Sequence, residues 1–149
     1  MSASTSTQIT RSALVPFSGA QMYRLVADVP TYPQFLPWCK EADVRHEGSH
    51  SALASLTIAK GPLRKRFTTH NHLFPDHRIE MALVDGPFRH LNGCWSFVDL
   101  GGEGTRVTLT MDFEIAGGLL RRALQPIFAE IANTMVESFC RRARDLYER

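Results

Sequence analysis

The longest regular pattern of hydrophobic and polar residues lies at the C-terminal end of the chain. Between residues 119 and 147, apolar side chains recur at the three- and four-residue spacing of a helix and cover about half of its circumference. The apolar positions are Leu120, Leu124, Ile127, Phe128, Ile131, Ala132, Met135, Val136, Phe139, Ala143 and Leu146. A stripe this wide must be buried, so we expect one long helix lying against a sheet formed by the preceding segments.

Alternation of apolar and polar residues predicts strands through most of the remaining chain. The predicted strands span residues 7–15, 39–47, 51–59, 63–73, 78–84, 88–99 and 105–115. Most of their connections are short and rich in glycine, proline and aspartate, which is typical of tight turns. Because parallel strands would need long crossovers, we expect consecutive strands to pair antiparallel.

Two short helices are predicted between the first two strands. Ser18 begins the first as the N-cap of a capping box, and Pro30 ends it. Thr31 caps the second, which has Pro33 in its first turn. The order of elements predicts an α+β fold in a single domain, residues 1–149. A curved antiparallel sheet of six to seven strands would wrap around the long C-terminal helix.

The inner face of the predicted sheet is apolar and carries a few polar side chains. With a period of two, the strand at 63–73 places Phe67, Thr69 and Asn71 on the side that faces the long helix. A straight helix laid across a curved sheet contacts the edges of the sheet more easily than its centre. A pocket for a hydrophobic ligand with a polar head would then remain between them. The alternative is a solid core, in which the polar atoms bond to each other or to buried water.

Two segments rich in proline and aromatic residues, 32–39 and 86–97, have the composition of a pocket rim. The residues expected to flank the mouth, and to rest on a membrane during lipid exchange, are Phe35, Leu36, Trp38, Pro87 and Phe88. The candidate ligand-binding residues are Phe35, Leu36, Trp38, Phe67, Thr69, Asn71, Met81, Leu83, Phe88, Leu91, Trp95, Leu109, Met111, Phe128, Ile131, Met135 and Phe139. Small cores under loops are the alternative interpretation of the two segments.

Catalytic and metal-binding motifs are absent from the sequence, which has no G-x-S-x-G, H-E-x-x-H, C-x-x-C or Gly-rich phosphate loop. His70 and His72 share the outward side of a strand without a third ligand at an obvious position, so we expect a surface pair. The turn of Asp76, His77 and Arg78 is expected to be a solvated hairpin tip rather than an acid–base site.

The densest basic cluster comprises Lys60, Arg64, Lys65 and Arg66. Its charges could contact the phosphates of RNA or of lipid headgroups. The alternative is an outward strand face whose charge only prevents unwanted association.

Composition narrows the class of protein. The chain has 149 residues, 44% of them hydrophobic, and a net charge of only +2, so DNA is not an expected partner. Its three cysteines contain no C-x-x-C pair, which favours a reduced compartment. The N-terminus resembles neither a secretory signal nor an organelle presequence, and no apolar stretch reaches the roughly 18 residues of a membrane span. We expect a cytoplasmic protein that can lie peripherally at the inner membrane.

Two motifs make the chain recognisable: Y-P-x-F-x-P-W-C at residues 32–39 and V-D-G-P-F-x-x-L-x-G-x-W-x-F at residues 84–97. With them, the chain resembles over its whole length the coenzyme Q-binding family of START-like (helix-grip) proteins. These belong to the polyketide cyclase/lipid-transport superfamily and include bacterial proteins called ribosome association toxins. The resemblance implies a curved sheet that grips the C-terminal helix around a hydrophobic tunnel. The missing presequence indicates a bacterial member.

The resemblance implies two functions. The first is non-enzymatic binding of ubiquinone or another polyprenyl lipid, in support of respiratory electron transport and without any required cofactor. The second is binding to the large ribosomal subunit, which would inhibit translation through a basic surface. An aromatase/cyclase on the same scaffold is a third hypothesis, but no inward-facing acid–base pair supports it. We expect the lipid-binding function, with ribosome association as the alternative.

Overall fold

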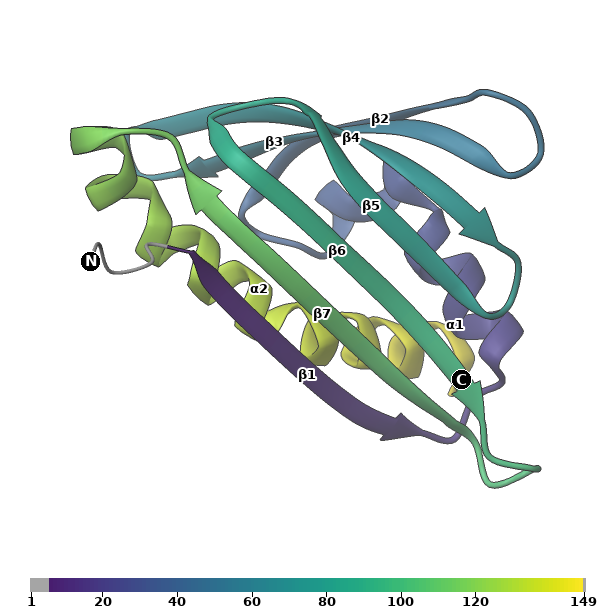
Figure 1. Cartoon of the computed structure of the whole chain (residues 1–149). Helices are drawn as coiled ribbons and strands as arrows, with labels where there is room; N and C mark the ends of the chain where they lie inside the picture. Colours follow the sequence, from purple (N-terminus) through teal and green to yellow (C-terminus); the bar gives the residue numbers. More distant parts are fainter. Residues whose placement is uncertain (1–5, 149) are drawn as a thin grey trace.

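A seven-stranded antiparallel sheet curves around the C-terminal helix in the computed structural model, which describes residues 6–148 (Figure 1). The strands are β1 Thr7–Val15, β2 Cys39–His46, β3 Ser51–Lys60, β4 Leu63–Phe74, β5 Arg78–Asp85, β6 Phe88–Asp99 and β7 Thr105–Ile115. Their order across the sheet is β1-β7-β6-β5-β4-β3-β2, and all neighbours are antiparallel. The predicted fold class is confirmed.

The long helix α2, Gly118–Tyr147, lies across the concave face of the sheet (Figure 1). All of its buried residues except Cys140 belong to the predicted stripe: Leu124, Phe128, Ile131, Ala132, Met135, Val136, Phe139 and Ala143. The inward residues of the sheet cover this stripe, and the two sets form one core cluster. Within residues 6–148, no helix is long and apolar enough to cross a membrane.

The short helices differ in kind. Helix α1, Gly19–Ala27, begins at Ser18 with the predicted capping box: Gln21 N donates to Ser18 Oγ, and Ser18 N donates to Gln21 Oε1. The second is a 3-10 helix, η1 (Val29–Gln34), which begins before the predicted cap Thr31. Thr31 donates its hydroxyl to the carbonyl of Asp28 instead of capping. Pro30 suits the start of this short helix because the first amide groups need no partner, whereas Pro33 lies inside it.

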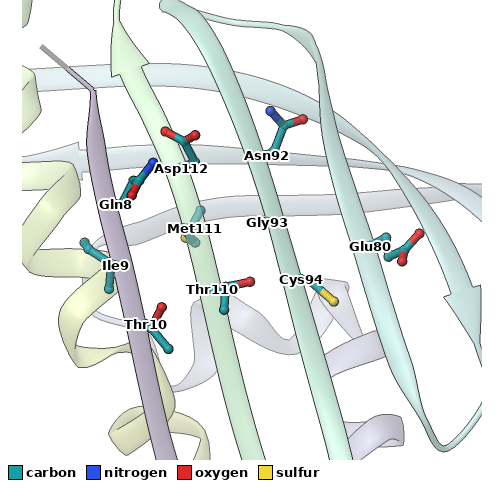
Figure 2. Close-up of a pocket in the computed structure, with 10 residues that line it drawn as sticks. All are labelled: Gln8, Ile9, Thr10, Glu80, Asn92, Gly93, Cys94, Thr110, Met111 and Asp112. Carbon is teal, nitrogen blue, oxygen red and sulfur yellow. The ribbon is translucent and has the colours of Figure 1, made fainter. Parts of the chain in front are cut away.

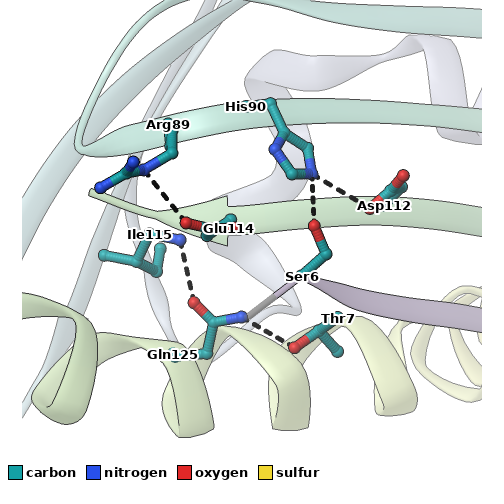
Figure 3. Close-up of polar contacts among 8 residues, drawn as sticks. All are labelled: Ser6, Thr7, Arg89, His90, Asp112, Glu114, Ile115 and Gln125. Carbon is teal, nitrogen blue, oxygen red and sulfur yellow. Dashed lines mark hydrogen bonds and ion pairs between the residues drawn. The ribbon is translucent and has the colours of Figure 1, made fainter. Parts of the chain in front are cut away.

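Gln125 joins α2 to the sheet at the end where the helix begins (Figure 3). Its Oε1 accepts a hydrogen bond from Ile115 N, at the end of β7, at 2.9 Å. Its Nε2 donates to Thr7 Oγ1, at the start of β1, at 2.7 Å. A second contact further along α2 joins Arg11 of β1 to Asn133, also at 2.9 Å. These bonds fix the angle at which the helix crosses the sheet, and so the space beneath it.

Replacing Gln125 with methionine should therefore destabilise the protein. The variant keeps the length of the side chain but leaves a backbone amide and a hydroxyl without their partner, which costs about 1–3 kcal/mol. Urea unfolding measures this loss. Glu137→Gln, on the exposed side of the same helix, is the control and should change the free energy of unfolding by less than about 0.5 kcal/mol. Equal stability of the Gln125 variant and the wild type would contradict the proposed anchor.

Candidate functional site

The interior between α2 and the sheet is nearly filled. One cavity of about 50 Å³ remains there. Its lining residues are Val29, Tyr32, Ala54, Leu56, Phe67, Thr69, Asn71, Met81, Trp95, Leu109, Met111 and Met135. A second cavity, of about 20 Å³, shares several of these residues. Because one water needs roughly 10–15 Å³ of such space, the two cavities have room for a few waters and none for a prenylated quinone. The expectation of an open tunnel is therefore wrong for this structure.

The candidate ligand-binding residues separate into three groups. Those that line the cavity are Phe67, Thr69, Asn71, Met81, Trp95, Leu109, Met111 and Met135. Those that belong to the packed core without lining it are Leu36, Phe88, Leu91, Phe128, Ile131 and Phe139. Phe35, Trp38 and Leu83 are partly buried and pack against the edge of this core.

Four lining residues were not predicted. Ala54 and Leu56 lie on the inner face of β3, and the alternation along that strand could have identified them. Val29 and Tyr32 come from η1, where a short helix gives no such pattern. Their position depends on how η1 packs on the sheet, so sequence periodicity could not reveal them.

Three polar side chains of the cavity, Tyr32, Thr69 and Asn71, form hydrogen bonds within the protein. Thr69 Oγ1 donates to Asn71 Oδ1 at 2.7 Å, which corresponds to the alternative expected for a solid core. The hydroxyl of Tyr32 donates to the carbonyl of Val26, and burial raises the pKa of this phenol well above its usual value. The cavity therefore holds neutral hydrogen-bonding groups and no charge.

Methionines form the adaptable part of the wall: Met81, Met111 and Met135 all line the cavity. Gly93 lies between the first two on the inner face, and a Cβ there would come within 2.8 Å of the Met81 Cε atom. Thioether side chains are flexible and easily repacked. This wall can yield more readily than one of branched aliphatic side chains.

Aromatic packing closes the end of the interior where the tunnel mouth was expected. Phe128 of α2 has its ring centroid 4.6 Å from Phe113, 5.0 Å from Phe88 and 5.8 Å from Phe67. The β5–β6 turn approaches so closely that a Cβ on Gly86 would lie 2.5 Å from the Phe67 Cβ atom. The hairpin side of the predicted mouth is thus filled by packed aromatic rings.

The rim prediction is wrong for two of its residues. Leu36 is only 1% exposed and Phe88 only 6%, because each fills space in the core. Phe35 packs its ring against Phe139, with centroids 5.1 Å apart. Trp38 keeps part of its surface accessible.

The structure divides the basic cluster between the two faces of the β3–β4 hairpin, with Arg64 and Arg66 outward as predicted. In the register of β3 and β4, Lys65 stands opposite the buried Ile58 and therefore lies on the inner side, as does Lys60. Arg64 and Arg66 lie on the outer side. Arg66 is bonded to Asp43 at 2.7 Å, and Lys60 to Glu130 of α2 at 3.1 Å. Alternation along the two strands is the physical reason for the division.

The outer face of the sheet carries a shallow, polar depression of about 450 Å³ (Figure 2). Its lining residues are Gln8, Ile9, Thr10, Glu80, Asn92, Gly93, Cys94, Thr110, Met111 and Asp112. His70 and His72 also lie on the outer face, with ring centroids 4.8 Å apart. Within the described residues, no group of three or more His, Cys, Asp or Glu side chains could hold a metal ion.

Ser6, His90 and Asp112 meet near this depression and superficially resemble a catalytic triad (Figure 3). Both the Ser6 hydroxyl and the Asp112 carboxylate contact the same ring nitrogen, His90 Nε2, each at 3.1 Å. A triad needs the carboxylate on the opposite nitrogen, where it orients the imidazole as a base for the hydroxyl. The geometry therefore does not activate Ser6.

The cysteines are not activated as nucleophiles either. Burial raises the pKa of the Cys39 thiol to about 11 and also raises the pKa of Cys94 and Cys140. A thiol with a raised pKa is a poor nucleophile near neutral pH because little thiolate is present.

The order in which iodoacetamide alkylates the three cysteines near pH 8 should follow how deeply each thiol is buried. We expect Cys94, which is only partly buried, to react first, while buried Cys39 and Cys140 stay unmodified until guanidinium is added. Peptide mass mapping over time measures the order. Faster modification of Cys39 than of Cys94 in the native protein would contradict the burial and the raised pKa of the Cys39 thiol.

This architecture, a curved antiparallel sheet gripping a long helix around a small apolar interior, defines a START-like protein. The family model for polyketide cyclase / dehydrase and lipid transport matches residues 15–140, and the chain belongs to that family. A START superfamily protein from Mycobacterium smegmatis has the same fold, with a TM-score of 0.77, 18% identity, and coverage of 93% of this chain and 98% of the other.

Two of the relatives are named for different functions. The chain is 48% identical over 142 residues to the ribosome association toxin RatA of Pseudomonas aeruginosa, which covers 95% of this chain and 99% of that protein. It is 31% identical over 147 residues to the mitochondrial coenzyme Q-binding protein COQ10 homolog B of Xenopus laevis, covering 95% and 60%. The predicted family is thereby confirmed, and the more similar of these two relatives bears the name of the alternative function.

Proposed function

We propose that this chain associates with the ribosome, on its large subunit, and thereby inhibits translation. The observation that carries this proposal is the 48% identity to a ribosome association toxin over nearly the full length of both proteins. Similarity to the coenzyme Q-binding relative is lower and covers only 60% of that protein. The filled interior also favours a function exercised by the surface.

A group of cations without acidic partners supports the proposal. We call it the cationic end; it comprises Arg64, Lys65, Arg121 and Arg122. Among the residues that the structure describes, none of the four forms an ion pair, whereas Lys60, Arg66 and Arg89 do. The β3–β4 turn and the start of α2 lie at the same end of the molecule (Figure 1). Contact between Phe67 of β4 and Phe128 of α2 keeps the two segments together.

The charges near the start of α2 act against the stability of the helix. No acidic residue lies in its first turn, and its N-cap, Gly117, provides no side-chain hydrogen bond. Cations near a helix N-terminus are unfavourable by about 0.3–1 kcal/mol, because the macrodipole is positive there. Arg121 and Arg122 thus strengthen a positive potential that folding alone does not need. Ribosomal RNA offers phosphates that complement it.

Replacing the cationic end with alanines (R64A/K65A/R121A/R122A) should weaken co-sedimentation with purified large subunits about tenfold or more at low salt. The dependence of log affinity on log salt should also become shallower, by about one unit for each phosphate that the variant no longer binds. Sucrose-gradient sedimentation over a range of salt concentrations measures both quantities.

The control is a variant with the same change in net charge, R24A/K40A/R106A/R144A, whose exposed cations lie on α1, β2, the start of β7 and the end of α2. It should bind the subunit almost as the wild type does. Equal weakening of both variants would mean that net charge alone drives binding. Absence of sedimentation by the wild type would contradict the proposal itself.

Binding of a hydrophobic ligand such as ubiquinone inside the protein is the second candidate function. The methionine-rich wall favours it, because this wall can repack around a headgroup that the resting cavity does not accommodate. Such a ligand would require the aromatic cluster at the closed end to move. It would serve as a bound molecule rather than a catalytic cofactor.

Met135→Asp should abolish this binding, since it places a carboxylate among apolar residues at a cost of several kcal/mol. Met135→Leu is the matched apolar control. Mass spectrometry of organic extracts should detect a prenylated quinone or similar lipid with the wild type and the leucine variant only. A lipid-free extract, together with no change in Trp95 fluorescence on adding ubiquinone, would contradict the second candidate. A folded aspartate variant should still bind the ribosome.

A further inference from the structure

A groove larger than the interior cavities lies beside the cationic end, between α2, the end of β3 and the segment that enters β2. Its volume is about 290 Å³. The lining residues are Pro37, Trp38, Ala59, Lys60, Glu130, Ile131 and Thr134. Trp38 and Ile131 give it an apolar part, and Lys60 and Glu130, 51% and 63% exposed, form a polar margin open to solvent. The groove is separate from the interior, whose lining it does not share.

The backbone of Trp38 is fixed at the edge of this groove. Its carbonyl accepts a hydrogen bond from Ala59 N at 2.9 Å, which joins it to β3, and Pro37 restricts the backbone before it. Within residues 6–148, the indole N–H has no hydrogen-bond acceptor. An indole that is partly buried normally finds such a partner. Trp38 therefore offers apolar indole surface and a free donor to whatever enters the groove.

The ammonium group of Lys60 can exchange the Glu130 carboxylate for another anion. Its bond to Glu130 Oε2, at 3.1 Å, lies in solvent, where such a pair contributes little to stability. A phosphate can compete with that carboxylate for the ammonium group. Lys65 lies on the same inner side of the hairpin and adds a second positive charge nearby. The Thr134 hydroxyl donates to backbone carbonyls of α2 and remains able to accept a hydrogen bond.

We propose that this groove binds one unpaired nucleotide of RNA, with its base stacked on Trp38 and its phosphate held by Lys60. The inference rests on the proposed association with the ribosome and names the part of the RNA that is recognised. Base stacking on an aromatic ring beside a cation is the usual way in which proteins bind single-stranded RNA. A duplex keeps its bases stacked inside and cannot offer one to a recess.

The recessed position of Trp38 favours RNA over a membrane. A bilayer surface contacts aromatic side chains that protrude, whereas Trp38 lies between walls from α2 and β3. The carboxylate of Glu130 on the margin also opposes a broad anionic surface. A single nucleotide can enter between the walls and leave Glu130 in water.

Fluorescence of Trp38 tests the proposal directly. In a Trp95→Phe background, Trp38 is the only tryptophan. Octa-adenylate or octa-uridylate should quench its emission, and an RNA duplex of eight base pairs should not. Vesicles of phosphatidylcholine and phosphatidylglycerol are the competing probe. Quenching by these vesicles but not by the single strands would overturn the proposal and assign the groove to lipid headgroups.

Variants separate the roles of the side chains, with the affinity for labelled octa-adenylate measured by anisotropy. Trp38→Leu should weaken binding about 5- to 100-fold, and Trp38→Phe less, because it keeps an aromatic face. Lys60→Ala should weaken binding severalfold, with Lys40→Ala as the control. Glu130→Gln should tighten binding, because it removes the carboxylate that competes for Lys60. Weaker binding by a folded Glu130→Gln variant would contradict the proposal that a phosphate replaces the Glu130 carboxylate at Lys60.

Sedimentation with the ribosome separates failure of this inference from failure of the proposed function. If the inference holds, a folded Trp38→Leu variant loses affinity for single-stranded RNA and for the large subunit together. Unchanged sedimentation of that variant, with loss of sedimentation in the cationic-end variant, would overturn the nucleotide site and leave ribosome association intact. Should Trp38→Leu fail to fold by circular dichroism, Trp38→Phe and Glu130→Gln decide the question.

Discussion

Burial of one wide apolar stripe on α2 is the constraint on which the rest of this structure depends. The helix has nine buried residues. The concave face of the sheet covers most of them, and Tyr32 and Phe35 from the η1 segment pack against Phe139. Phe128 shows how closely the two surfaces fit, because it contacts aromatic rings from β4, β6 and β7 at once. Close packing of this kind leaves little empty space. The small interior cavity and the sealed end are consequences of the same fit.

Because of the same packing, charged side chains lie at the edges of the interface between α2 and the sheet. Charged groups cannot enter the apolar interior without partners, so cations lie at its margins, and the four of the cationic end lie where β4 and α2 begin. The groove at Trp38 arises where the helix passes the end of β3 and the fit is incomplete. Both features of the proposed ribosome-binding surface therefore lie where the helix–sheet packing ends. A change in the angle of α2 would alter them together, which links the anchor at Gln125 to function.

One fold in this family serves proteins named for two different functions, and a scaffold by itself does not decide between them. The groove at Trp38 and the interior cavity share no lining residue. Three methionines and a glycine keep the interior adaptable even though it is closed. The activity of a particular member then depends on which of the two regions its partners engage.

Most helices and strands could be predicted from the sequence because alternation and capping depend only on neighbours in the chain. Examples are the strands at 88–99 and 105–115 and the capping box at Ser18. The class of fold followed because short turns allow only antiparallel pairing. The burial of Leu36, the aromatic seal at Phe88 and the contributions of Val29 and Tyr32 to the cavity depended on tertiary structure. Each results from contacts between segments far apart in the chain, and volume left between packed side chains has no local signature. The basic cluster depended on both the sequence and the tertiary structure. Its residues were evident from the sequence, but the pairing of Lys60 with Glu130 and the groove at Trp38 required α2 to pack against the β3–β4 hairpin.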